Sequence, residues 1–456
     1  MMDRIPGSLR RLADKVKNNP LIMRVLRNSG VILSANSVAS GFSMLQGIIA
    51  ARLLGVAGFG MLSPITQFVT NINRLTSFRM GELVVSYVGE FSANEKPEDA
   101  AAIFKTAALV ESASAFLAFF LVVVLAPFGA RIFLQDPAGV DLIRLYAGIL
   151  LANLFSESAT GLLQYYDRFK FLGVITVIQS IVTLLLIGLA WLLQGGLAHV
   201  VLAYMMGKIV GAVSISVYSL RLAGQQWGRG WFRVSILSLK PRFGELIRFA
   251  VSTNISGTVN LVTRDSDTLW LSALSSPLQV GYYKVAKAFM NVLVVPVNPM
   301  ISTTYRELAR EITSRAWKNV RYLLRTGTLI AGGYSIAAGV GMVVLGPWLV
   351  RLYGEDFGPA YGVLLVLLAG FMVANTFYWS RTVFLPLGMP EFPTKVGVAM
   401  AALEILLMLW LVPQIGAIGL SAALSLYFIG MAAVLVGRLI REVKQRAQID
   451  LTSGGA

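Results

Sequence analysis

Long apolar stretches constrain this chain more than any other feature of its sequence. They are about twenty residues long, the length at which an α-helix crosses the hydrocarbon core of a bilayer. Helix is required there because lipid offers no hydrogen-bond partner to backbone polar groups. Hydrophobic residues make up 56% of the chain and charged residues only 14%, whereas about 25% of a soluble domain is charged. The sequence therefore predicts an all-α polytopic membrane protein.

The apolar stretches predict twelve transmembrane helices in two six-helix lobes. Their approximate ranges are 28–51, 59–87, 104–126, 143–164, 172–193, 197–220, 247–271, 279–304, 323–346, 360–384, 393–412 and 416–438. The predicted parts are a basic amphipathic segment on the cytoplasmic surface (1–27), an N-lobe (28–222), an interlobe linker (223–245), a C-lobe (246–441) and a cytoplasmic tail (442–456). No cleavage site of a signal peptide follows the first apolar stretch.

The net charge of +16 follows membrane topology rather than nucleic-acid binding, since no soluble surface is long enough to collect the basic residues. Lys and Arg concentrate before the first span, between spans 6 and 7, between spans 8 and 9, and after span 12. The loops on the other side hold only Arg52, Arg131, Arg144 and Arg351. Cytoplasmic loops accumulate cations, so we expect both termini in the cytoplasm of a bacterial inner-membrane protein.

Three short motifs recur in order along the chain at a nearly constant offset. Gly58-Phe59-Gly60 recurs as Gly281-Tyr282-Tyr283, Arg131-Ile132-Phe133 as Arg351-Leu352-Tyr353, and Gln194-Gly195-Gly196 as Gln414-Ile415-Gly416, at offsets of 223, 220 and 220. Six spans per repeat is an even number, so both halves enter the membrane the same way. We expect them to be related by an axis along the membrane normal, with a site at their interface.

These motifs also carry a family resemblance. The stretch from Asp267 to Arg306, with Gly281-Tyr282-Tyr283-Lys284-Val285-Ala286 inside it, resembles the start of the second lobe in bacterial polysaccharide and O-antigen repeat-unit flippases. Leu53–Gly60 and Gly416–Gly419 are similar to the matching elements before spans 2 and 12. The resemblance covers about residues 28–438. It implies a V-shaped central lumen lined by spans 1, 2, 7 and 8, with alternating access.

Charged residues inside the spans are the candidate substrate ligands. The basic ones on helices that the resemblance assigns to the lumen are Arg74, Arg79, Arg264, Lys284 and Lys287. Each costs about 2.5–3.5 kcal/mol at membrane depth on insertion scales, so the cluster indicates an anionic ligand. Guanidinium and ammonium groups bind phosphate, which favours a polyprenyl-diphosphate-linked oligosaccharide. Polar side chains for the sugar are Asn71, Asn254 and Asn260, with Gln67, Asn73 and Tyr282 beside them.

Other charges are assigned to gating or ion coupling, and each has a structural alternative. The gating and coupling candidates are Asp265, Asp267, Glu82 and Glu157, and Glu111 and Glu404 are further acidic positions. As alternatives, Arg264 neutralises Asp267 on one helix face, Asp265 pairs with Lys284 or Lys287 to close an outer gate, and Glu157 pairs with Lys208.

Three other functions are weighed against a flippase of polysaccharide repeat units. A multidrug-and-toxin-extrusion antiporter needs carboxylates in its first lobe, and span 1 has none. A membrane glycosyltransferase, polymerase or ligase needs a large outer loop, and the longest predicted here is 127–142. A peptidoglycan-precursor flippase usually carries fourteen spans. We expect no enzyme activity, cofactor, metal or nucleic acid, a monomer in contact with membrane lipid, and a polysaccharide polymerase as a possible partner.

Overall fold

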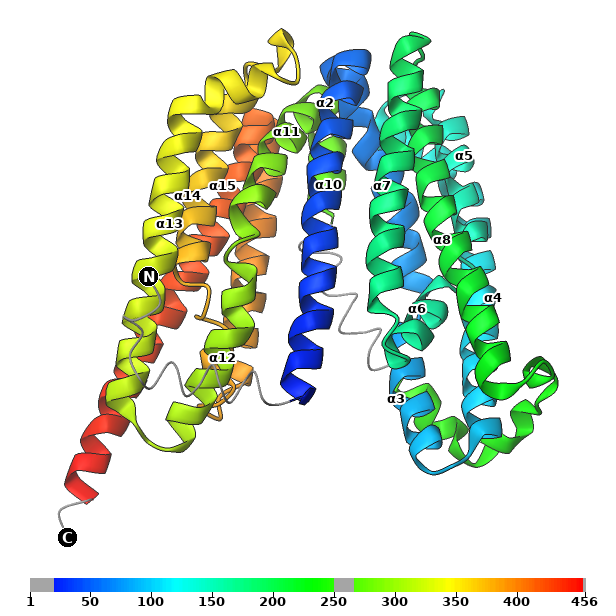
Figure 1. Ribbon diagram of the computed structural model, residues 1–456. Helices are drawn as coiled ribbons and strands as arrows, with labels where there is room; N and C mark the ends of the chain where they lie inside the picture. The colour runs from blue at the N-terminus through cyan, green and yellow to red at the C-terminus, as the bar shows by residue number, and fades with distance from the viewer. Residues whose placement is uncertain (1–19, 250–265, 454–456) are drawn as a thin grey trace, which may run out of the picture. The chain divides into compact units, whose positions relative to one another are not determined.

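A computed structural model describes residues 20–249 and 266–453, and within these ranges the chain is helical without any strand (Figure 1). The helices of the first half are α2 (Pro20–Thr76), α3 (Met80–Ala93), α4 (Pro97–Gly129), α5 (Gly139–Ala152), α6 (Ser156–Tyr165), α7 (Phe169–Leu192) and α8 (Leu197–Trp227). Those of the second half are α10 (Asp267–Leu274), α11 (Pro277–Val294), α12 (Asn298–Thr313), α13 (Trp317–Arg351), α14 (Ala360–Thr376) and α15 (Glu391–Ser453).

Seven helices in the described part of the chain are long and apolar enough to cross a membrane, or eight if the bent pair α11 and α12 is one span. Two of the seven, Ile32–Thr76 and Glu391–Arg446, run for 45 and 56 residues, more than twice the roughly 20 that one crossing needs. Each contains a break, at Gly55 (φ 67°) and at Ile415–Gly416 (φ 56° at the glycine). Both breaks fall where the sequence predicts that one span ends and the next begins. The chain is thus a multi-pass helical membrane protein, while the number of twelve spans and the two-lobe arrangement stay predictions.

The described residues form two compact units. The first unit comprises residues 20–49, 68–127 and 140–249, and the second comprises 50–67, 128–139 and 266–453. In the first unit α7 packs along α8, and α6 contacts both α3 and α8. In the second unit α14 contacts α11, α13 and α15. The contacts assign two segments of the predicted N-lobe, 50–67 and 128–139, to the second unit.

The predicted repeat is visible in the turns between helices. Glu95 and Arg315 are separated by the same offset as the later two motif pairs, and both adopt the left-handed conformation, with φ of 56° and 55°. The turns around them share one hydrogen-bond pattern: Asn94 N to Glu90 O and Lys96 N to Phe91 O match Ser314 N to Arg310 O and Ala316 N to Glu311 O. The helices that follow, α4 and α13, begin at Pro97 and Trp317, which are again one repeat apart. The same offset therefore relates these two turns and the helices that follow them.

Several predicted boundaries differ from those of the helices. The predicted outer loop 127–142 is mostly helical, because α4 runs to Gly129 and a π-helical turn (Ala130–Leu134) follows before α5 begins. Helix α8 extends into the predicted linker, which continues as two 3₁₀ turns, Trp231–Arg233 and Ile236–Arg242.

At the C-terminal end, α15 continues beyond residue 441 to Ser453. Glu442 there accepts Arg438 and Arg446 at i−4 and i+4, at 3.2 and 2.9 Å, and such pairs support a helix that leaves the membrane. The predicted amphipathic segment 1–27 lies outside the described residues except for its last turns, which are helical.

Candidate functional site

Two breaks in the helices of the first unit lie against each other. One separates α2 from α3 at residues 77–79, and the other separates α5 from α6 at residues 153–155. Ser77 Oγ donates to Glu157 Oε2 across them at 3.5 Å. Helices α3 and α6 touch through their backbones, since a Cβ placed at Gly161 would lie 2.4 Å from the carbonyl oxygen of Gly81. Glycine at both positions is what permits this approach.

The two breaks form a polar groove of about 440 Å³. Its lining residues are Arg79, Gly81, Glu82, Ser156, Glu157, Thr160, Gly161 and Gln164. Arg79 stands in the left-handed region (φ 51°, ψ 49°), which a residue with a Cβ adopts at a cost. Its guanidinium pairs with Glu82 at 2.6 Å, and both side chains are half exposed. The sequence assigned Arg79 to substrate binding and Glu82 and Glu157 to gating or coupling. The structure brings the three to one groove, where Arg79 pairs with Glu82, and their roles stay predictions.

Arg74 and Asn71 lie on the last turns of α2, just before the break. The Arg74 side chain is exposed and Asn71 is buried. Arg74 and Arg79 both act electrostatically on the Glu157 carboxylate. Two basic and two acidic side chains thus gather around one groove, which is less cationic than the sequence predicted.

Glu111 has a structural role that the sequence left open. Its buried carboxylate accepts the backbone N–H groups of Glu157 and Ser158, both at 2.8 Å, and the Ser158 hydroxyl at 2.6 Å. These are unpaired donors at the start of α6, where the helix dipole favours a negative charge. Lys208, the predicted partner of Glu157, instead lies 5.9 Å from the centroid of the Tyr146 ring. That predicted pairing is wrong.

In the second unit a buried carboxylate gathers residues from α10 and α11. Asp267 Oδ2 accepts the Tyr283 hydroxyl at 2.8 Å and the Lys287 ammonium, and Oδ1 accepts the Thr268 backbone N–H at 2.8 Å. Thr268 also donates its hydroxyl to Gln67 on α2. The sequence prediction named Asp267 and Lys287 for separate roles and missed Tyr283. The available signal was that Tyr283 and Lys287 are four residues apart, on one face of a helix.

The neighbouring crossing of α2 and α11 explains the glycine motifs. A Cβ at Gly60 would lie 1.8 Å from Pro277 O, and one at Gly281 would lie 2.4 Å from Val56 O. Both contacts involve glycines of the recurring motifs, so α2 and α11 approach each other through small residues, as close helix packing requires. Lys284 Nζ lies 4.0 Å from the centroid of the Phe59 ring at the same crossing.

Four predicted site residues, Asn254, Asn260, Arg264 and Asp265, lie outside the described residues. The alternatives that pair Arg264 with Asp267, or Asp265 with a lysine, are therefore untested. Asp267 does pair with Lys287. Across residues 20–249 and 266–453, no three His, Asp or Glu side chains gather as a metal ion would need.

The fold of long apolar helices has solved counterparts among membrane transporters. The inward-facing structure of a multidrug resistance MATE transporter of the MOP superfamily superposes with a TM-score of 0.69 at 14% identity, over 89% of this chain and 96% of that one. The lipid II flippase MurJ in an inward closed conformation gives 0.69 at 15% identity, over 92% and 91%. The fold is therefore that of MOP-superfamily transporters.

The sequence profile of a family described as "Polysaccharide biosynthesis protein" matches residues 25–305, and the chain belongs to that family. The inner membrane protein YghQ of Escherichia coli (strain K12) is 23% identical over 75% of this chain and 95% of its own length. The probable flippase AglR of Haloferax volcanii is 25% identical over 39% of this chain and 38% of its own. The chain is therefore a member of this polysaccharide biosynthesis family, with the fold of the membrane transporters above.

Proposed function

We propose that the protein flips a polyprenyl-diphosphate-linked oligosaccharide from the cytoplasmic to the outer leaflet of a bacterial inner membrane by alternating access. The observation that carries this is the pair of arginines at the break between α2 and α3. Arg79 lines the polar groove, and Arg74 is exposed on the last turn of α2 and acts electrostatically on Glu157 of that groove. Cations inside a membrane protein are costly and mark substrate pathways, and the family supplies a saccharide context.

The groove can exchange its internal ion pair for a phosphate. The Arg79–Glu82 pair is half exposed, and exposed pairs contribute only about 0–1 kcal/mol. A diphosphate can therefore take Arg79 from Glu82 at little cost and bind it through two parallel hydrogen bonds. Gln164 and Thr160 line the same groove and supply polar side chains for sugar hydroxyls.

The Asp267–Lys287 pair serves gating better than substrate binding in this scheme. Asp267 is 7% exposed and receives three donors, so removing Lys287 to a phosphate would leave a buried carboxylate uncompensated. We assign this pair, together with Lys284 on Phe59 and the crossing at Gly60 and Gly281, to an outer gate. Both termini are placed in the cytoplasm, and the protein is taken to act as a monomer.

Arg74→Ala tests the function directly. In proteoliposomes loaded with a polyprenyl-diphosphate oligosaccharide, we expect this variant to reduce flipping about 10- to 100-fold, since a charge-assisted hydrogen bond contributes about 1.5–3 kcal/mol. Arg74→Lys should restore part of the rate, because lysine keeps the positive charge but cannot donate two parallel hydrogen bonds as a guanidinium does. Arg144→Ala, which removes an exposed arginine of α5 in the same unit, is the matched control and should leave the rate unchanged.

The same vesicles separate the competing substrates. A cationic drug exchanged for protons would indicate the antiporter activity of the MATE relatives, and preference for lipid II over other diphosphate-linked sugars would indicate a peptidoglycan precursor. Normal flipping by Arg74→Ala would assign that arginine a structural role and remove the main support for an anionic substrate.

A further inference from the structure

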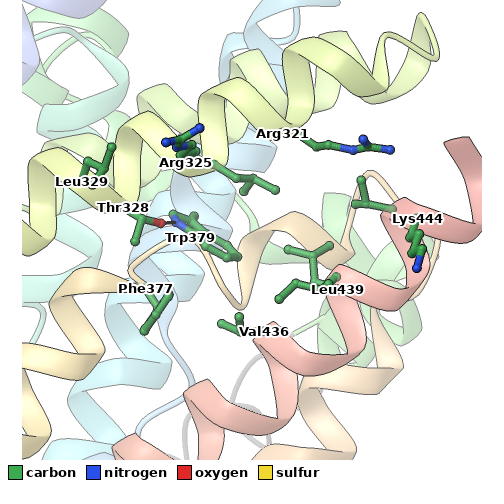
Figure 2. Close-up of a pocket in the computed structure, with 12 residues that line it drawn as sticks. Arg321, Arg325, Thr328, Leu329, Phe377, Trp379, Val436, Leu439 and Lys444 are labelled. Carbon is green, nitrogen blue, oxygen red and sulfur yellow. Dashed lines mark hydrogen bonds between the residues drawn. The ribbon is translucent and has the colours of Figure 1, made fainter.

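A second hollow, of about 590 Å³, lies in the second unit between α13, α15 and the segment that follows α14 (Figure 2). Most of its wall is apolar. The apolar lining residues are Leu324, Leu329, Phe377, Trp379, Val436, Leu439, Ile440 and Val443. The polar atoms of Thr328 and Trp379 are already paired, because Trp379 Nε1 donates to Thr328 Oγ1 at 3.0 Å. We call this hollow the α13–α15 groove.

The α13–α15 groove is charged at one end only. Figure 2 shows Arg321 and Lys444 at one end and Leu329 and Phe377 toward the other, with Arg325 between them on α13. From Arg321 to Leu329 the helix rises by about 12 Å, at 1.5 Å per residue. The charged end is the one that the topology prediction places in the cytoplasm. An occupant therefore needs an anionic head at the predicted cytoplasmic end of the groove and an apolar tail that reaches deeper into the membrane.

The three cations of the groove make no ion pair with any described acidic residue, although acids are close in sequence. On the same stretch of α15, Glu442 pairs with Arg438 and Arg446. Arg321, Arg325 and Lys444 take part in no such pair within residues 20–249 and 266–453. Their charge is left for a ligand or for water.

The internal repeat shows that this surface is covered in the other half of the chain. Under the offset that relates α4 to α13, Arg325 on α13 corresponds to Lys105 on α4. Lys105 Nζ donates to the carbonyl oxygen of Val234 in the linker, at 3.0 Å. Linker residue Trp231 packs on Phe104, with ring centroids 5.4 Å apart, and Trp227 packs there as well. In the second half the corresponding face of α13 lines a hollow among the described residues, and α15 runs on as a helix to Ser453.

We propose that the α13–α15 groove binds an anionic glycerophospholipid of the cytoplasmic leaflet, with its phosphate on Arg321, Arg325 and Lys444 and an acyl chain along Leu329, Phe377 and Val436. The lipid takes the place that the linker occupies in the first half. Guanidinium and ammonium groups supply charge-assisted hydrogen bonds to phosphate, and the apolar wall replaces bulk lipid around the chain. This site does not depend on which substrate is flipped.

Native mass spectrometry of the purified full-length protein tests the proposal. The wild-type protein should bind one molecule of dioleoyl-phosphatidylglycerol, and it should bind this lipid more tightly than dioleoyl-phosphatidylcholine. Arg321→Gln/Lys444→Gln should weaken binding of that lipid about 30-fold, as each basic residue near an anionic headgroup contributes about a fivefold factor. The matched control is Lys318→Gln/Arg441→Gln, which removes the same charges from exposed positions of the same two helices that do not line the groove, and it should bind normally.

A second variant tests the tail without touching charge. Val436→Trp fills the apolar part of the groove and should also weaken phosphatidylglycerol binding, which keeps the test usable if the charge variant does not fold. Equal loss in the two charge variants would mean general surface attraction and overturn the proposal. Displacement of the lipid by inorganic phosphate would reduce the site to an anion site, and displacement by polyprenyl diphosphate at equal or lower concentration would assign the groove to the substrate. Either result overturns it.

Discussion

At the scale of single residues, two ion pairs differ in how exposed they are and therefore in what it costs to separate them. Arg79 and Glu82 are half exposed, whereas Asp267 is buried and hydrogen-bonded to Tyr283 and Lys287. Exposed pairs exchange partners at little cost, and buried pairs do not. The first suits a residue that must release and capture substrate, and the second suits one that holds two helices together.

Lys287→Met should therefore destabilise the protein by about 3–5 kcal/mol, the cost of stranding a buried carboxylate. Asp267→Asn/Lys287→Met should recover most of that loss, because neither charge remains. The midpoint of thermal unfolding in detergent measures both, and the coupling between the two sites follows from the double-mutant cycle. If the double variant were no more stable than Lys287→Met, the ion pair would not be the source of stability.

The predicted interlobe linker contributes a pH-dependent contact. Arg242 donates hydrogen bonds to Glu245 and to Glu90, so the pKa of the Glu245 carboxyl is held below its usual range. A carboxyl whose pKa is lowered by folding stabilises the fold above its unfolded pKa of about 4.3, and this stability is lost as the pH falls through the folded value. Acidification below the folded pKa of Glu245 should loosen the linker. Tryptophan fluorescence, to which Trp227 and Trp231 contribute, should change with it. Arg242→Gln should abolish this step, whereas Arg233→Gln should keep it.

At the scale of elements, glycines determine how closely two pairs of helices approach each other. The backbones of α3 and α6 touch at Gly81 and Gly161, and those of α2 and α11 touch at Gly60 and Gly281. The nearest atoms are backbone carbonyls rather than side-chain ends, so they cannot move aside. These contacts fix the helices that form the polar groove and the proposed gate.

Gly161→Ala should cost about 1–3 kcal/mol, because an added methyl group forces α3 and α6 apart. Gly188→Ala is the matched control, since nothing lies within 4 Å of a Cβ at that position of α7. Alanine there should be neutral or stabilising by up to about 1 kcal/mol through helix propensity. Thermal unfolding of both variants checks the difference in sign, and equal effects would show that the close contact is not present in the membrane.

At the scale of the whole molecule, the proposed anionic substrate predicts how the membrane potential acts on flipping. The cell interior is negative, so outward movement of an anion gains about 2.3 kcal/mol per charge per 100 mV. A diphosphate with roughly two charges gains about 4–5 kcal/mol per 100 mV if its full charge crosses the field. In proteoliposomes, a potential that is negative on the cytoplasmic face should accelerate flipping without any Na⁺ or H⁺ gradient. Flipping that followed an ion gradient and ignored the potential would make acidic residues the coupling groups, with Glu82 tested first.

The sequence by itself indicated that this protein lies in a membrane, that it is helical, that it contains a repeat and which family it resembles. These follow from composition, from the length of apolar runs and from motifs such as Gly58–Gly60 and Gly281–Tyr283, all of which are local or periodic signals. It also identified most of the charged residues that gather at the polar groove, because a charge within an apolar run is conspicuous.

Only the tertiary structure decided the partners of those charges. Arg79 meets Glu82, Lys287 meets Asp267, and Glu111 caps α6 rather than holding an ion. No sequence pattern distinguishes these outcomes, since each depends on where a helix breaks and on which backbone comes close enough for a hydrogen bond. The α13–α15 groove could not be predicted for the same reason, because its walls come from segments far apart in the sequence.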